Sequence, residues 1–168
     1  MSKSILFLGA STGVGLATLE RALATSPDTT CVALLRDPSK LDALAAAHPG
    51  NLVIIKGNAH SVDDLARALV RPNPSSSSSS TGTGTSPSPG SLVDIVHFSI
   101  GVRPDALLRM PDPDVTKKGM SALLEALTRI RSSSPSQKDH PASTSKPLIS
   151  VVSGAGIVAD RTVRDYPL

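Results

Sequence analysis

This 168-residue chain has few aromatic residues and a single cysteine. It has no tryptophan, and its phenylalanines and tyrosine are only Phe7, Phe98 and Tyr166. Single-stranded nucleic acids are usually bound on aromatic surfaces that stack with the bases, so this scarcity argues against that kind of partner. The lone Cys31 offers neither a disulfide framework nor a zinc-ligand spacing, and the four histidines are scattered. We therefore expect no nucleic-acid partner and no metal.

Long apolar runs are also missing. The N-terminal run from Ile5 to Leu8 ends at Gly9 and is shorter than the core of a secretory signal peptide. No segment approaches the ~18 apolar residues of a membrane span. The net charge of +3 is small and the basic residues are dispersed, which does not favour a general affinity for polyanions. These features predict a cytoplasmic protein with no membrane partner.

Two segments are too polar and too rich in proline and glycine to help form a core. Residues 71–91 and 132–146 consist mainly of Ser, Pro, Thr and Gly. Both lie between segments with regular hydrophobic patterns, so we interpret them as low-complexity loop insertions and not as domain boundaries. The remaining chain is long enough for one modest α/β core, which predicts a single domain over residues 1–168.

A glycine-rich turn follows the first apolar run. Gly9, Gly13 and Gly15 give the spacing G-x-x-x-G-x-G. A P-loop is disfavoured because Val14 occupies the place of its second glycine and no lysine follows. Glycines between a strand and a helix let backbone approach a pyrophosphate, and the N–H groups at the helix start favour negative charge. An ordinary structural turn is the alternative. The expected cradle consists of Gly9, Ser11, Thr12, Gly13, Val14 and Gly15.

Short apolar runs alternate with helical patterns along the rest of the chain. After the first strand, further strands are expected over residues 31–35, 52–55, 92–98 and 148–152. Asp94 interrupts the fourth. This alternation indicates βαβ units and a parallel sheet covered on both faces. We predict a three-layer, doubly wound α/β fold (Rossmann) of about five strands in the order 3-2-1-4-5, with ligand at the carboxyl ends of the first and fourth strands.

Two helix starts have capping signals. Asp37 precedes Pro38, a residue favoured in the first turn of a helix. Ser61, with Asp64 three residues later, resembles a capping box. We expect both Asp37 and Ser61 to cap the helices that follow them.

The spacing of the glycine turn resembles that of the short-chain dehydrogenase/reductase superfamily. Residues 33–41 and 119–127 resemble its atypical branch, the NmrA-like and fungal-type NAD(P)-binding proteins. Arg36 ends the second strand, where an arginine suits the extra phosphate of NADP and an acidic residue suits the ribose of NAD. We therefore expect NADP(H) as cofactor, although a solvated arginine is the alternative and the adjacent Asp37 keeps NAD open.

The resemblance also implies contacts at other strand ends. Asn58 and Ala59, after the third strand, would lie near the adenine, although a plain turn is the alternative. The same holds for the segment after the fourth strand, which would pass the ribose and nicotinamide. That segment consists of Ser99, Ile100 and Gly101.

Two candidate catalytic residues follow the fifth strand. In the superfamily, a serine orients the substrate carbonyl and a tyrosine acts as general acid, which makes Ser153 and Tyr166 the candidates. The lysine of the Y-x-x-x-K motif would fall beyond Leu168. The string around Tyr166 also resembles a loop of fungal-type members, and Pro167 fits a catalytic helix poorly.

The resemblance leaves three functions open. The first is hydride transfer between nicotinamide and a small carbonyl or alcohol, as in a reductase. The second is an NmrA-like regulator that senses dinucleotide without turnover, and the third is an isomerase or epimerase. The superfamily's substrate-binding part follows the fifth strand, so we expect this chain to be truncated. The substrate and the oligomeric state are not indicated.

Overall fold

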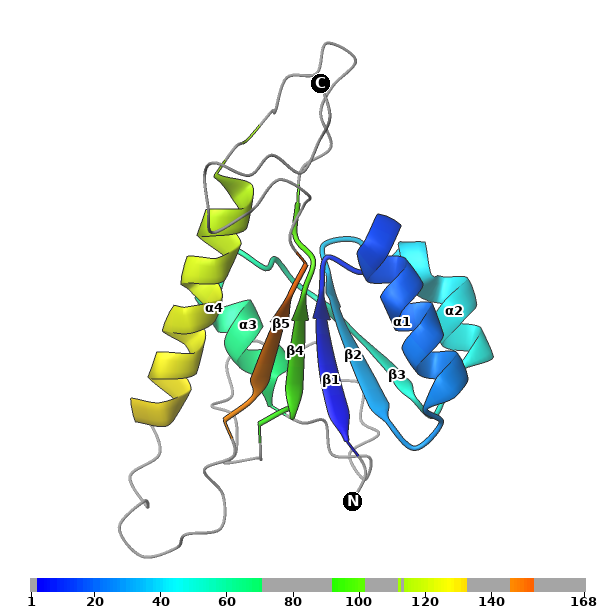
Figure 1. Cartoon of the computed structure of the whole chain (residues 1–168). Helices are drawn as coiled ribbons and strands as arrows, with labels where there is room; N and C mark the ends of the chain where they lie inside the picture. Colours follow the sequence, from blue (N-terminus) through cyan, green and yellow to red (C-terminus); the bar gives the residue numbers. More distant parts are fainter. Residues whose placement is uncertain (1–2, 71–91, 102–111, 113, 133–145, 153–168) are drawn as a thin grey trace, which may run out of the picture.

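Five parallel strands form one sheet in the order β3-β2-β1-β4-β5 (Figure 1). The computed structural model describes residues 3–70, 92–101, 112, 114–132 and 146–152. The strands are β1 (Ser4–Leu8), β2 (Thr30–Leu35), β3 (Leu52–Lys56), β4 (Ile95–Phe98) and β5 (Leu148–Val151). The predicted Rossmann-type sheet and its strand order are confirmed.

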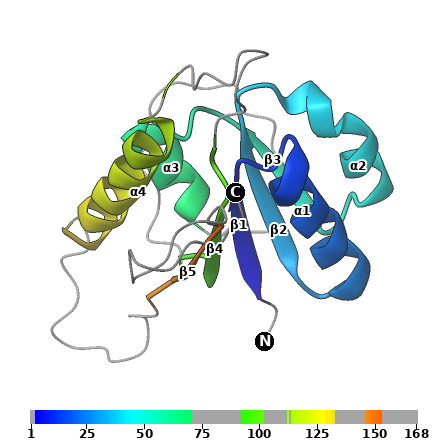
Figure 2. The ribbon, with the colours of Figure 1, turned by 45° about the horizontal axis from the view of Figure 1, so that its top comes forward.

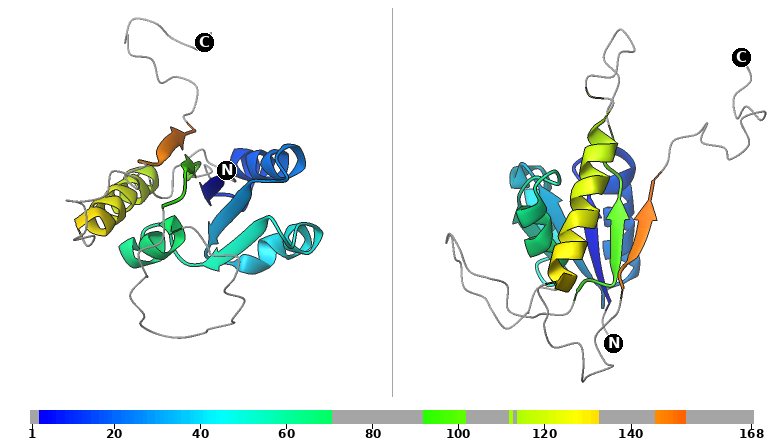
Figure 3. Two further views of the ribbon diagram at one scale, coloured as in Figure 1. Left: turned by 90° about the horizontal axis from the view of Figure 1, so that it is seen from below. Right: turned by 90° about the vertical axis from the view of Figure 1, so that its left-hand side faces the viewer.

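Helices lie on both faces of this sheet. They are α1 (Gly13–Thr25), the 3-10 helix η1 (Pro38–Leu41), α2 (Asp42–Ala47), α3 (Val62–Leu69) and α4 (Val115–Ser132). Figure 2 shows α1 and α2 on one face and α3 and α4 on the other, and the view from below in Figure 3 agrees. The three-layer arrangement is therefore also confirmed. None of the described helices is both long and apolar enough to cross a membrane.

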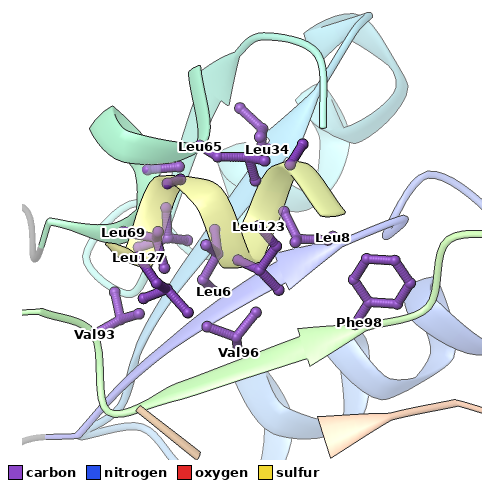
Figure 4. Packing of buried hydrophobic residues seen from close by; sticks show 14 residues of the cluster. Leu6, Leu8, Leu34, Leu65, Leu69, Val93, Val96, Phe98, Leu123 and Leu127 are labelled. Carbon is purple, nitrogen blue, oxygen red and sulfur yellow. The ribbon is translucent and has the colours of Figure 1, made fainter. Parts of the chain in front are cut away.

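The strands bury alternate side chains in two cores. Leu6 and Leu8 of β1 face α3 and α4, where they pack in one cluster with Phe98 and Leu123 (Figure 4). Phe7 belongs to the opposite cluster, which lies under α1 and α2. Successive side chains of a strand point to opposite faces, so a continuously apolar strand supplies both cores at once. Each fully buried large side chain contributes about 1.5–3 kcal/mol relative to an exposed one.

Strand β4 is shorter than the expected 92–98 run because of Asp94. Ser4 donates to Asp94 Oδ2 from its backbone N (2.7 Å) and from Oγ (3.0 Å), and Asp94 N donates back to Ser4 Oγ (3.2 Å). A half-buried carboxylate requires such partners. Leu92 instead forms an isolated antiparallel bridge with Val70. The apparent flaw in the apolar pattern thus joins the starts of β1 and β4.

Helices cover both faces of the sheet as expected, but the edge strand β5 is largely exposed. Leu148 and Val151 are 64% and 51% exposed. This strand pairs with β4 alone in the described part of the chain, so its apolar sequence does not bring burial. Most of the two predicted insertions lies outside the described residues. At their limits, Ser132 ends α4 and Lys146 is exposed.

Candidate functional site

The turn between β1 and α1 requires glycine at its first position. Gly9 has φ of 90°, in the left-handed region that side chains disfavour. A Cβ atom on Gly9 would lie 2.7 Å from the carbonyl oxygen of Ser99 and 3.0 Å from the nitrogen of Ile100. The absence of a side chain at Gly9 therefore lets the end of β1 lie directly against the chain leaving β4.

The third glycine brings the helix onto the same point. A Cβ atom on Gly15 would overlap the Gly9 carbonyl oxygen and Ser99 Oγ. Ser99 in turn donates to the Leu8 carbonyl oxygen from both its N and its Oγ, each at 2.9 Å. The start of α1 and the ends of β1 and β4 are thus packed backbone to backbone. Figure 1 shows this junction at the tips of the strand arrows.

The N-terminus of α1 has no side-chain cap. Thr12 occupies the N-cap position in an extended conformation, but its side chain makes no capping hydrogen bond, and the first turn contains no acidic residue. Gly13 has φ of 62°, and no atom lies within 4 Å of the place that its Cβ would take. Helix N-termini have N–H groups without intrahelical partners and a partial positive charge. An uncapped helix start of this kind can accept an anion, and phosphate binding by the cradle stays a prediction.

The end of β2 separates Arg36 from Asp37. Arg36 is exposed and makes no ion pair with any described residue. Asp37 Oδ1 accepts hydrogen bonds from Ser39 Oγ (2.7 Å) and Ser39 N (3.2 Å), so the predicted cap is confirmed, although η1 is a 3-10 helix. The hydrogen bond from the Ser39 hydroxyl is the main cause that holds the pKa of Asp37 below its usual range. Asp37 is thus engaged locally, whereas Arg36 is not.

The end of β3 forms a compact turn around Asn58. Its backbone N donates to Asp64 Oδ2 (2.8 Å), and its Oδ1 accepts from the His60 N (3.1 Å). Ala59 is half-buried against the core on the α3 and α4 side. The amide nitrogen of exposed Asn58 has no partner among the described residues, but part of its side chain already serves the turn. Contact of Asn58 and Ala59 with adenine stays a prediction.

Only half of the predicted capping box forms at α3. Ser61 Oγ accepts from the Asp64 N (3.3 Å), as expected. The Asp64 carboxylate binds the Asn58 N–H and Arg67 instead of returning to the Ser61 N–H. The Ser61 N–H donates to the Asn58 carbonyl (2.9 Å), so a backbone turn has replaced the reciprocal bond.

The end of β4 is fixed by the first turn of α4. Thr116 Oγ1 donates to the Ile100 carbonyl oxygen (3.1 Å), and a Cβ atom on Gly119 would lie 3.1 Å from Ile100 Cδ1. Gly101 is exposed, with no atom within 4 Å of its Cβ position. The sequence alone did not indicate that Thr116 and Gly119 position this segment. The sequence feature that could have indicated them is a hydroxyl residue followed three positions later by a glycine near the start of α4.

The burial of His97 within β4 was not predicted. His97 is only 8% exposed, and its Nε2 has no hydrogen-bond partner among the described residues. Its ring centroid lies 5.5 Å from that of Phe7. Burial lowers the pKa of His97, so the imidazole is neutral at pH 7. Burial likewise raises the pKa of the Cys31 thiol to about 11, which leaves that residue unreactive at neutral pH.

The two candidate catalytic residues cannot be placed. Ser153 and Tyr166 lie outside the described residues, and their roles stay predictions. The described residues contain no group of His, Cys, Asp and Glu side chains that could hold a metal ion. The site that the structure assembles is therefore the glycine turn with the neighbouring ends of β2, β3 and β4.

The first part of the chain matches a family of cofactor-binding proteins. Residues 9–73 match the family model described as NAD(P)H-binding. The match begins at Gly9 and spans Arg36, Asn58 and Ala59, but it covers less than half of the chain. This segment is similar to NAD(P)H-binding proteins. No curated protein matches the sequence.

Solved structures share the fold over most of this chain. A short-chain dehydrogenase/reductase from Burkholderia multivorans with bound NADP superposes with a TM-score of 0.56 at 20% identity, covering 97% of this chain and 64% of that one. KRED1-Pglu superposes with a TM-score of 0.51 at 20% identity, covering 79% of this chain and 53% of that one. A short-chain dehydrogenase/reductase from Veillonella parvula superposes with a TM-score of 0.51 at 14% identity, covering 93% of this chain and 49% of that one. At such identities the likeness shows the Rossmann fold, and the chain spans between 49% and 64% of their lengths.

Proposed function

We propose that this chain binds NADP(H) as the cofactor-binding part of a protein like the short-chain reductases. One observation supports this most directly. Among the three described turns that lead from a strand into a helix, those after β2 and β3 are capped by Asp37 and Ser61, whereas the turn before α1 has no side-chain cap. That turn is also the one built on glycines packed backbone to backbone.

The cradle fits a pyrophosphate in two ways. The unoccupied space at the Cβ position of Gly13 lets a ligand reach the backbone, and the uncapped start of α1 favours negative charge. Gly9 and Gly15 shape the turn, and the hydroxyls of Ser11 and Thr12 with the Val14 amide would add donors. Because no acidic side chain lies in the first turn of α1, nothing there repels phosphate.

We assign the cofactor as NADP in preference to NAD because of the end of β2. Arg36 is exposed and without an ion pair among the described residues, while Asp37 is bound by Ser39. Ser39 occupies Oδ1 of Asp37 with two hydrogen bonds, which leaves only Oδ2 for a ribose hydroxyl and makes Asp37 a weaker candidate than Arg36. In this proposal Asn58 and Ala59 border the adenine, and Ser99, Ile100 and Gly101 border the nicotinamide end.

The proposed reaction moves a hydride between nicotinamide and a small carbonyl or alcohol. The bound cofactor supplies or accepts the hydride. Ser153 would orient the carbonyl, and the Tyr166 hydroxyl would give its proton to the carbonyl oxygen as the carbon accepts hydride. Both roles come from the resemblance to short-chain reductases of the atypical, NmrA-like and fungal type. A cytoplasmic location belongs to the same proposal.

A regulator that senses dinucleotide without turnover is the second candidate. The described residues that support the proposal, in the cradle and at the ends of β2, β3 and β4, all concern cofactor binding, and this proposal assigns proton transfer to none of them. Consumption of NADPH with a panel of aldehydes and ketones distinguishes the two. Turnover supports the reductase, and its absence in a longer version of the protein supports the regulator.

The proposal is tested by titrating NADPH and NADH separately, with nucleotide fluorescence as the readout. We expect the protein to bind NADPH more tightly. Arg36→Gln should reduce this preference while leaving NADH affinity unchanged, because NADH lacks the extra phosphate. Failure to bind either nucleotide contradicts the proposal, and equal affinity or a preference for NADH contradicts the assignment of NADP.

A further inference from the structure

A second basic residue ends the strand next to Arg36. Lys56 is the last residue of β3 and is the register partner of Leu35, the last residue of β2. The Gly57 N donates to the Leu35 carbonyl oxygen (2.8 Å), which continues the pairing past the strand ends. Arg36 follows Leu35 directly. Two cations from neighbouring strands therefore lie at the same edge of the sheet.

The described basic residues fall into two groups, those that bind an aspartate and those without an ion pair among the described residues, and these cations belong to the second group. Arg67, Lys118 and Arg129 each bind an aspartate within the described part of the chain. Arg36, Lys56 and Lys40 of η1 are exposed and make no such ion pair there. Exposed like charges at neighbouring positions repel one another, and a bound anion would relieve that repulsion.

Asp37 lies among these cations but forms no ion pair with any of them. Asp37 is held by the Ser39 hydroxyl, and Lys40 and Lys56 lie close enough to help keep the pKa of Asp37 low. The region thus combines three cations that have no ion pair among the described residues with two carboxylates that already have partners: Asp37 is bound by Ser39, and Asp64 is bound by the Asn58 N–H and Arg67. This leaves a net positive charge at the ends of β2 and β3.

We propose that Lys56 is a second specificity-determining residue for NADP, which binds the 2′-phosphate from β3 while Arg36 binds it from β2. This inference rests on the proposed function. The two side chains would contribute differently: the planar guanidinium of Arg36 orients the phosphate, whereas the ammonium of Lys56 adds charge on a flexible stem. The register between β2 and β3 fixes the two backbones that present these groups.

The test compares ligands with and without the extra phosphate. In the full chain, Lys56→Gln and Arg36→Gln are assayed against NADPH and NADH, and against 2′,5′-ADP and 5′-AMP as adenosine probes. Lys117→Gln removes the same charge from an exposed position on α4 and serves as the control. Thermal unfolding verifies that each variant folds.

We expect Lys56→Gln to weaken NADPH and 2′,5′-ADP about three- to tenfold, as is typical for loss of a partly exposed charged contact. NADH and 5′-AMP should bind as in the wild type. Lys56→Arg should retain the preference for NADPH, and Lys117→Gln should change nothing. Added salt should reduce NADPH affinity more steeply for the wild type than for Lys56→Gln.

The outcomes separate this inference from the proposed function. If the wild type binds neither nucleotide, the proposed function itself fails. If the wild type prefers NADPH and Lys56→Gln keeps that preference, the role of Lys56 is refuted while the proposed function stands. An equal loss of NADPH and NADH affinity also refutes it, because a structural or general nucleotide effect would not depend on the 2′-phosphate.

Discussion

Two turns at the same edge of the sheet differ in how the N-terminus of the following helix is capped. Both connect a strand to a helix, one from β1 to α1 and the other from β3 to α3. The second is satisfied by its own residues: Ser61 caps α3, and Asp63 and Asp64 lie in its first turn. The first has neither a side-chain cap nor an acidic residue. This contrast is the main support for the proposed phosphate site at the start of α1.

The two turns also differ in what packs against their glycines, Gly9 in the first and Gly57 in the second. At Gly9 an added Cβ would meet the backbone of Ser99, which cannot move aside without displacing β4. At Gly57 the nearest atoms would be Leu34 Cδ1 (2.8 Å) and Asp64 Cβ and Cγ (3.0 Å each), all in side chains. The first turn is therefore closed by backbone atoms of another strand's end, whereas the second is closed by side chains.

The largest expected effect is that of Gly9→Ala. The added methyl group combines a positive φ with overlap of the Ser99 carbonyl, so we expect a loss of about 3 kcal/mol or more in the free energy of unfolding. Urea unfolding measures it. Gly50→Ala is the control, because no atom lies within 4 Å of its Cβ position. Wild-type stability in Gly9→Ala would mean that the ends of β1 and β4 are not in contact.

Converting the first turn into a copy of the second should separate stability from binding. Thr12→Asp supplies α1 with a charged cap, which should stabilise the protein by about 0.5–1 kcal/mol. The same carboxylate should repel the pyrophosphate and weaken NADPH tenfold or more, equivalent to about 1.4 kcal/mol. Thr12→Asn, which caps without charge, is the comparison. Unchanged NADPH affinity in Thr12→Asp would place the phosphates elsewhere.

Removing the cap of the second turn should lower stability but leave NADPH affinity nearly unchanged. Ser61→Ala leaves the Asp64 N–H without its side-chain partner and should cost about 1 kcal/mol of stability. NADPH affinity should stay within about twofold, because the α3 cap does not face the proposed phosphates. Chemical unfolding and nucleotide titration on one preparation give both quantities, and Ser61→Thr should restore stability. A large loss of NADPH affinity would show that the two turns are coupled.

The smallest effect is a pH dependence confined to the second turn. Partial burial by itself would raise the pKa of Asp64, but the hydrogen bonds from Asn58 and Arg67 outweigh it and hold the pKa below its usual value. The folded state then favours the carboxylate, so its stabilisation is present above the unfolded pKa of about 3.9 and is lost as the pH falls through the folded value.

Asp64→Asn should therefore be less stable than the wild type at pH 7, with a difference that shrinks below about pH 4. Urea unfolding at pH 7, 4 and 3 measures this difference. Asp28→Asn, at an exposed carboxylate, is the control, and its free energy of unfolding should stay close to that of the wild type at each pH. A constant difference across the range would show that Asp64 acts through packing and not through its charge.

Local patterns in the sequence were sufficient for the fold and for the position of the glycine turn. Alternating apolar runs predicted the strand order, because parallel βαβ connections permit few arrangements. Caps at Asp37 and Ser61 were also predictable, since a cap involves residues two or three apart in the chain. The spacing of Gly9, Gly13 and Gly15 indicated the cradle for the same reason.

Contacts between residues far apart in the sequence were not predictable. Asp94 interrupts the apolar pattern of its strand, and only the folded structure shows that it accepts a hydrogen bond from Ser4, ninety positions away along the chain. The burial of His97 and the exposure of β5 depend on which elements cover each face, and no local pattern shows this. Lys56 became a candidate only because the strand register pairs it with Leu35, the residue before Arg36.

The sequence by itself determined the elements of this protein and the places where its backbone can take unusual conformations, because hydrophobic period, caps and glycine positions act over a few residues. Only the tertiary structure decided which strand ends meet at the mouth of the glycine turn and which charges remain unpaired beside it. The reason is physical. Close backbone packing of Gly9 and Gly15 against Ser99, and the register that aligns Lys56 with Leu35, arise from contacts between segments that the chain brings together only on folding.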